Sequence, residues 1–275
     1  MSRRRQKKCP QRDESRRGKA GRLRRAAVVL LGVGLLSTAL AAGLLLSGVV
    51  GGGPSGPRAA IVDQLSLSQP NPDFAGSATD ILEQAGYAVD YFPGEEVTVD
   101  FYRNLPAHDY DLLILRVHSG LVTQVDVTTG EKTETEYVSL FTGEPYIEGK
   151  YAEEQQGRVG KSLYYEGASP LFGILPKFIE ESMRGSFDKT LIVLMGCDGL
   201  RSERTAQAFL DKGARAFVSW SRSVSASHSD AATLRLLEKL LIEGLPVGDA
   251  VAQTAAELGR GPSFGAELRV LPDGG

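Results

Sequence analysis

The chain has 275 residues, of which 42% are apolar and 24% are charged. This length and composition allow one or two domains with a sizeable core, and they exclude wholesale disorder. The net charge of -3 hides an asymmetry: residues 1–25 hold 12 Lys or Arg and two acids, residues 26–50 hold no charge, and the remainder holds 19 basic and 32 acidic residues. A basic head, an apolar segment and an acidic body are typical of a membrane protein.

Residues 26–50 are therefore predicted to form one transmembrane helix, because about 20 apolar residues suffice to cross a bilayer and a longer stretch crosses with some tilt. The basic tail at 1–25 is expected to stay in the cytoplasm, which places the rest of the chain outside the cell membrane. A signal peptide cleaved after Ala39-Leu40-Ala41 is the alternative, but apolar sequence continues past that site to Val50. The tail has no aromatic residue to stack on bases, so we expect contact with lipid rather than a nucleic-acid partner.

Strands and helices alternate after a flexible linker at 51–58. The apolar and amphipathic patterns predict strands at 59–67, 87–92, 111–117, 190–195, 214–220 and 266–271, and helices at 75–85, 171–183, 203–211, 227–243 and 246–258. Residues 121–165 read as an insertion that contains a β-hairpin around Thr129-Gly130. The alternation predicts one α/β domain at 59–275, with a mostly parallel six-stranded sheet and helices on both faces.

His118 and Cys197 come directly after the two most apolar strands, LLILRV and TLIVLM. Sites in open α/β sheets form outside the carboxyl ends of the strands. If these strands are neighbours, about 4.8 Å apart, the imidazole and the thiol face each other across one sheet edge. A base that removes the thiol proton creates the nucleophile of a cysteine hydrolase. The backbone N–H groups of Gly120 and Cys197 are candidates for the oxyanion hole.

The segments LLILRVHSG and TLIVLMGCDG resemble the caspase–gingipain–legumain group of cysteine peptidases, and the following AFLDKGARAFVSWSRSVS resembles its gingipain, clostripain and CHAT branch. The resemblance covers roughly residues 59–271. It implies a three-layer caspase-like fold and hydrolysis of peptides after a chosen side chain, with His118 as base, Cys197 as nucleophile and Gly120 in the oxyanion hole. Asp198 departs from the pattern, because a carboxylate aimed at the sulfur would raise the pKa of the thiol.

Three further residues are candidates for the substrate pocket. Trp220 and Arg222 follow the fifth strand, in the stretch that helps to form the specificity pocket in this family. Asp63 is an acid inside an apolar strand, and it is either a buried structural acid or a pocket acid that selects Arg or Lys. Cys9 and Cys197 are predicted to lie on opposite sides of the membrane, so Cys197 is expected as a free thiol. No ligand spacing for a metal is seen, and no cofactor is expected.

The sequence therefore predicts an extracytoplasmic, membrane-anchored cysteine endopeptidase that acts on a peptide or protein substrate. The alternative is a catalytically inactive module of the same fold that binds peptides or partner proteins. A receiver- or flavodoxin-like sensor is disfavoured, because Gln69-Pro70-Asn71-Pro72 offers neither acids nor a phosphate loop after the first strand.

Overall fold

The computed structural model describes residues 56–272, except for residues 126, 127 and 155. The basic tail at 1–25 and the predicted membrane span at 26–50 lie outside the described residues. Among the helices that the structure does describe, none has the length and apolar character needed to pass through a bilayer.

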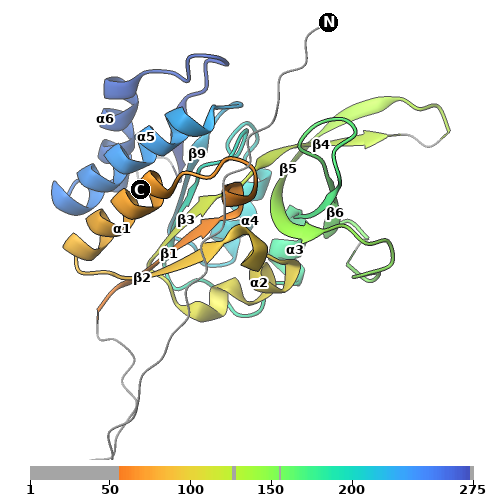
Figure 1. Ribbon diagram of the computed structural model, residues 1–275, viewed down its shortest axis with the longest axis horizontal. Coiled ribbons are helices and arrows are strands. Elements are labelled where there is room, and N and C mark those ends of the chain that lie inside the picture. Colours follow the sequence, from red (N-terminus) through yellow and green to blue (C-terminus); the bar gives the residue numbers. More distant parts are fainter. Residues whose placement is uncertain (1–55, 126–127, 155, 273–275) are drawn as a thin grey trace, which may run out of the picture. The chain divides into compact units, whose positions relative to one another are not determined.

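A six-stranded sheet with strand order β10-β9-β8-β3-β1-β2 organises the domain (Figure 1). Its strands are β1 (Arg58–Asp63), β2 (Ala88–Pro93), β3 (Leu112–Arg116), β8 (Leu191–Leu194), β9 (Ala216–Trp220) and β10 (Leu268–Leu271). The predicted α/β class is confirmed. The sheet is mixed rather than the mostly parallel one that the sequence predicted: β10 runs antiparallel to β9, whereas the other neighbouring pairs are parallel.

The direction of β10 follows from the two helices that precede it. Between β9 and β10 the chain forms α5 (Ala226–Leu237) and then α6 (Val247–Leu258), and both pack on the same face of the sheet. One crossover helix returns the chain to the start of a parallel strand, whereas a second helix brings it back to the opposite edge. β10 therefore enters at the carboxyl edge of β9 and runs the other way.

Helices cover both faces of the sheet because its strands are apolar on both faces. Successive strand residues alternate between two cores: Ile61, Ile114 and Val193 belong to one, and Val62, Leu115 and Leu194 belong to the other. The first core is closed by α1 (Pro72–Gln84), α5 and α6, which lie together on one side in Figure 1. The second is closed by α2 (Val99–Asn104), α3 (Pro176–Glu181) and α4 (Arg204–Asp211).

Helix α1 begins earlier than the sequence predicted. Asn71 caps it, because its side chain accepts a hydrogen bond from the backbone N–H of Phe74 at 3.2 Å. Pro72 occupies the first turn, where a missing N–H costs no helical hydrogen bond. The helix therefore starts at Pro72, three residues before the predicted start at Ala75.

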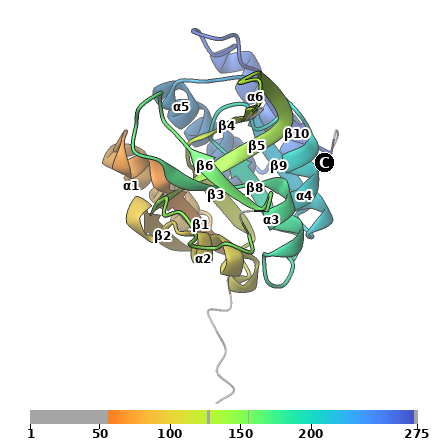
Figure 2. The ribbon, with the colours of Figure 1, turned by 90° about the vertical axis from the view of Figure 1, so that its right-hand side faces the viewer.

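A second sheet of four antiparallel strands, in the order β4-β5-β7-β6, follows directly from the end of β3 (Figure 2). Its strands are β4 (Ser119–Val125), β5 (Lys132–Pro145), β6 (Val159–Ser162) and β7 (Leu171–Ile174). The helix predicted at 171–183 is wrong over its first four residues, which form β7 between β5 and β6. Gly173 permits this pairing, because the Oγ atoms of Ser139 and Ser162 occupy the space that a Cβ would need.

Candidate active site

His118 and Cys197 follow neighbouring parallel strands and line the same cleft. β3 and β8 pair directly, with Leu115 opposite Leu194 at the last matched position. His118 lies two residues beyond the end of β3, and Cys197 lies three residues beyond the end of β8. Both side chains line a cleft of about 740 Å³ between the carboxyl edge of the main sheet and the face of the four-stranded sheet. Both residues are partly exposed.

Short contacts fix the two strand ends against each other. The hydroxyl of Ser119 donates to the carbonyl oxygen of Cys197 at 2.6 Å, and the N–H of Met195 donates to the carbonyl of Leu115 at 3.0 Å. Gly196 leaves no room for a side chain, because a Cβ there would collide with Ser119 Oγ and the Val117 carbonyl. The glycine before the cysteine therefore allows the segments that carry imidazole and thiol to approach closely.

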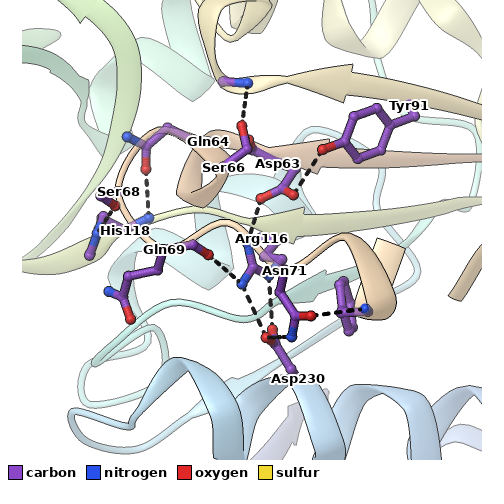
Figure 3. Close-up of polar contacts among 12 residues, drawn as sticks. Asp63, Gln64, Ser66, Ser68, Gln69, Asn71, Tyr91, Arg116, His118 and Asp230 are labelled. Atoms are coloured by element: carbon purple, nitrogen blue, oxygen red, sulfur yellow. Dashed lines mark hydrogen bonds and ion pairs between the residues drawn. The ribbon is translucent and has the colours of Figure 1, made fainter. Parts of the chain in front are cut away.

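Three residues contact the imidazole of His118, and a fourth contacts its backbone. Its Nε2 lies 3.0 Å from Ser68 Oγ, and its backbone N–H donates to Gln64 Oε1 at 2.9 Å (Figure 3). Tyr164 and Phe141 pack against the ring, with centroids 4.6 Å and 5.8 Å away. Burial among these groups disfavours the imidazolium, and the nearby positive charge of Arg116 adds to this, so the pKa of His118 falls to about 4. His118 is therefore neutral at physiological pH.

Cys197 lies against the segment that leads into α5. Its Sγ lies 3.4 Å from the N–H of Val224, which donates to it, and 3.5 Å from the Val224 carbonyl, to which the thiol donates. Ser225 caps α5, since its side chain accepts from the His228 N–H. The helix N-terminus beside the sulfur is thus that of α5.

The pKa of the Cys197 thiol lies above its usual value. Burial is the main cause, and the charge of Asp198 adds to it, while the hydrogen bonds from Val224 and Ser223 act in the opposite direction. Asp198 is buried, and its carboxylate accepts from the Ser223 hydroxyl at 3.1 Å. Both members of the predicted pair are consequently uncharged at neutral pH, and within the described residues no hydrogen bond joins the two side chains.

The structure places Asp63 away from the cleft, in a buried ionic cluster (Figure 3). Arg116 Nη1 donates to Asp63 at 2.7 Å, and Arg116 Nε donates to Asp230 of α5 at 2.9 Å. Arg116 and Asp63 are each 1% exposed. Burial opposes the charge of Arg116, but the hydrogen bonds from it to Asp230 and Asp63 outweigh this and raise its pKa. Of the two interpretations of Asp63 from sequence, this arrangement fits the structural acid.

Trp220 and Arg222, both predicted for the substrate pocket, lie in different environments. Trp220 is buried, and its Nε1 donates to Ser229 at 2.9 Å, so it supports α5 from below the site. Arg222 is exposed and lines a second cleft of about 460 Å³ together with Arg201 and Arg269. The two clefts share Asp198 and Ser223. Arg222 is therefore placed beside the Cys197 cleft, and Trp220 lies in the core.

Gly120, which the sequence predicted for the oxyanion hole, lines the same cleft as Cys197. Gln64, Ser68, Tyr164 and Val224 were missed as neighbours of the two reactive side chains. Only Ser68 carried a signal, since it follows the first strand at the same sheet edge as His118. Within the described residues there is no group of three or more His, Cys, Asp or Glu side chains that could hold a metal ion.

Comparison with protein-family models and with curated proteins finds no match to this chain. The functional assignment therefore depends on the geometry and chemistry of the site itself.

Proposed function

We propose that the chain is a cysteine endopeptidase of the caspase–gingipain–legumain type, in which Cys197 is the nucleophile and His118 the base. One observation carries the proposal: the imidazole and the thiol line one cleft at the ends of two adjacent parallel strands. The direct contact between Ser119 and the Cys197 carbonyl supports it, because it holds the two segments in register. The caspase-like three-layer arrangement is part of this proposal.

The reaction is acyl transfer. The sulfur of Cys197 attacks the carbonyl carbon of the scissile peptide bond while the thiol proton passes to His118. The N–H groups of Gly120 and Cys197 stabilise the negative charge on the carbonyl oxygen. His118 then gives its proton to the leaving amine, which leaves a thioester on Cys197. Water, deprotonated by His118, attacks the thioester and releases the carboxylic acid and the free thiol.

The pKa directions of the resting site favour proton transfer during the attack rather than before it. A raised thiol pKa and an imidazole pKa near 4 keep the pair uncharged until substrate binds. The Val224 N–H at 3.4 Å from the sulfur stabilises the charge that develops when the proton leaves. Exclusion of water by a bound peptide strengthens this interaction, because fewer water dipoles screen it.

A thiol-directed peptide probe tests the proposal. The chain has a second cysteine, Cys9, so labelling is measured in a Cys9→Ser background. We expect labelling and peptide cleavage in this background, loss of both in Cys197→Ala, and loss of cleavage in His118→Ala. His108→Ala serves as the histidine control, because His108 precedes β3 at the opposite sheet edge. Equal cleavage by the parent and Cys197→Ala would refute a cysteine peptidase.

The second candidate is a module of this fold that binds a peptide without cleaving it. The observation that favours it is the uncharged pair: burial keeps the thiol of Cys197 protonated and makes the imidazole of His118 a weak base. In that case a peptide library bound by the full chain is recovered intact, and Cys197→Ala binds it as tightly as the parent does.

We also propose that residues 26–50 anchor the enzyme in the cell membrane, with residues 1–25 in the cytoplasm. The support is the uncharged stretch beside 12 basic residues. Carbonate extraction of membranes tests the anchor, since an integral protein stays in the pellet. Protease added to intact cells tests the orientation, because it should degrade the body and spare the tail.

A further inference from the structure

The second cleft, which Arg222 lines, lies directly beside the Cys197 cleft. It has a volume of about 460 Å³ and shares Asp198 and Ser223 with the Cys197 cleft. The backbone connects the two, because the N–H of Asp198 donates to the carbonyl of Arg222 at 3.2 Å. Since an extended peptide advances about 3.3 Å per residue, a peptide held at Cys197 can place a nearby side chain in the second cleft.

Three guanidinium groups line the second cleft, those of Arg201, Arg222 and Arg269. All three side chains are exposed. Arg201 pairs with Glu134 at 3.3 Å. Across the part of the chain that the structure describes, the side chains of Arg222 and Arg269 form neither an ion pair nor a hydrogen bond. Two exposed cations of the cleft therefore remain available to an anionic ligand.

The two arginines are carried by paired segments of backbone. β9 and β10 are antiparallel neighbours, and their pairing continues beyond the end of β9. The N–H of Ser221 donates to the carbonyl of Glu267 at 2.9 Å, and Ser221 Oγ accepts from the N–H of Glu267 at 3.0 Å. Arg222 and Arg269 thus have a fixed backbone, which reduces the entropy lost when their side chains bind a ligand.

The acids of the second cleft do not cancel these charges. Asp198 is only 6% exposed and lies 3.7 Å from Arg201, so its carboxylate offers little surface to a ligand. Glu267 pairs with Arg260, which lies outside the second cleft. The second cleft is therefore positive, although the chain beyond residue 50 holds 19 basic and 32 acidic residues. A positive cleft in an acidic body attracts anions.

We propose that Arg222 and Arg269 form a subsite that binds the carboxylate of an Asp or Glu side chain in the peptide substrate, near the bond that Cys197 cleaves. A guanidinium group presents N–H donors in a planar fork that matches the two oxygens of a carboxylate. A Lys or Arg side chain of the peptide is repelled by the same two charges. Cleavage of the bound peptide rests on the proposed function, whereas the preference for an acidic peptide does not.

A peptide library tests the subsite. Fluorescent heptapeptides carry Glu, Gln or Lys at each position in turn, with mixed residues elsewhere, and fluorescence anisotropy measures their binding to the full-length Cys197→Ala chain, which leaves them intact. We expect Glu to bind roughly 5- to 10-fold more tightly than Gln at one position. Added salt should weaken this preference, because it screens the exposed charges. Equal binding of Glu and Gln at every position, or a preference for Lys, would overturn the proposal.

Substitutions assign the preference to the two arginines. Arg222→Gln and Arg269→Gln should each reduce the preference for Glu, and Arg222→Glu combined with Arg269→Glu should shift it to Lys. Arg215→Gln is the matched control, because Arg215 is exposed and precedes β9 at the opposite edge of the sheet. A preference for Glu that persists unchanged in the doubly substituted chain contradicts the subsite. The preference in the Cys197→Ala chain and its response to salt need no arginine variant, so they decide even if one fails to fold.

Cleavage by the parent separates the subsite from the proposed function. We expect the same preference for Glu over Gln in kcat/KM at the position found by binding. If the chain binds the Glu peptides more tightly but the parent cleaves none, the proposed function fails and the subsite stands. If the parent cleaves Glu and Gln peptides with equal kcat/KM and the Cys197→Ala chain binds them equally, the proposed function stands and the subsite fails.

Discussion

The backbone N–H of Val224 donates to Sγ of Cys197 over 3.4 Å, although the two residues are 27 positions apart in the chain. The contact places the sulfur beside the N-terminus of α5, where a developing thiolate gains from the aligned N–H groups of the first turn. Burial and Asp198 nevertheless keep the pKa of the resting thiol above its usual value. In the resting site Cys197 is therefore protonated, but a hydrogen-bond donor is already in place for its thiolate.

The rate of Cys197 alkylation by a small reagent such as iodoacetamide should rise with pH through the alkaline range, without a plateau below neutral pH. The reason is that only the thiolate reacts, and its pKa is raised. The measurement is made in the Cys9→Ser background. A plateau reached below pH 7 would instead reveal a preformed thiolate–imidazolium pair.

His118 should make the stability of the fold depend on pH between 6.5 and 4. Its folded pKa of about 4 lies below the ordinary value of 6.5, so the unfolded chain binds the proton first. Neutral His118 therefore contributes its full share of the free energy of unfolding above pH 6.5, and this share is lost as pH falls toward 4. Because the His118 side chain is partly exposed, the loss is on the order of 1–2 kcal/mol. Urea unfolding at several pH values should show a smaller loss in His118→Gln than in the parent. An equal effect from His108→Gln would argue against this origin.

Replacement of Arg116 by Met should destabilise the fold by about 3–5 kcal/mol, because Asp63 and Asp230 remain buried without their partner. Addition of Asp63→Asn and Asp230→Asn to Arg116→Met should recover part of the loss, since no uncompensated charge then remains. Arg158→Ala is the control: its ion pair with Glu181 is exposed to solvent and should contribute less than about 1 kcal/mol. Similar losses in Arg116→Met and Arg158→Ala, measured by urea unfolding, would contradict the assignment.

Two glycines at the site should differ in their tolerance of alanine. A Cβ at Gly196 meets Ser119 Oγ and the Val117 carbonyl, whereas a Cβ at Gly120 has open space around it. Gly196→Ala should therefore cost about 1–3 kcal/mol in the free energy of unfolding. Gly120→Ala should stay within about 0.5 kcal/mol of the parent. It should also keep its activity, because the backbone N–H is retained. Loss of stability in Gly120→Ala alone would reverse this assignment.

The sequence predicted the elements whose signal is local. Apolar strands followed by His118 and Cys197 could be recognised from the pattern alone, and the structure places both residues at one cleft. The short strand β7 was missed because Leu171 to Ile174 also fits the start of a helix. Its pairing depends on Gly173, because the Oγ atoms of Ser139 and Ser162 leave no room for a Cβ at that position. This is a tertiary contact, so the local sequence does not reveal it.

The contacts that shape the site could not be predicted, because they join residues far apart in the chain. Gln64 and Tyr164 are 100 positions apart, and Arg116 and Asp230 are 114 apart. A single sequence gives no pairing between such positions. Asp63 is an example. The sequence showed that it is an acidic residue in an apolar strand, but it did not show that Arg116 of the third strand is its partner.

The ionic cluster has a consequence for folding. Arg116 on β3 finds its acceptors in three other segments: Asp63 at the end of β1, the Gln69 carbonyl in the following loop, and Asp230 near the start of α5. A chain that has docked β1 and β3 but not α5 holds a buried cation with part of its coordination missing. Such partly assembled forms are higher in free energy than both the folded and the unfolded chain. The strands β1 and β3 and the helix α5 are therefore expected to form and melt as one cooperative unit.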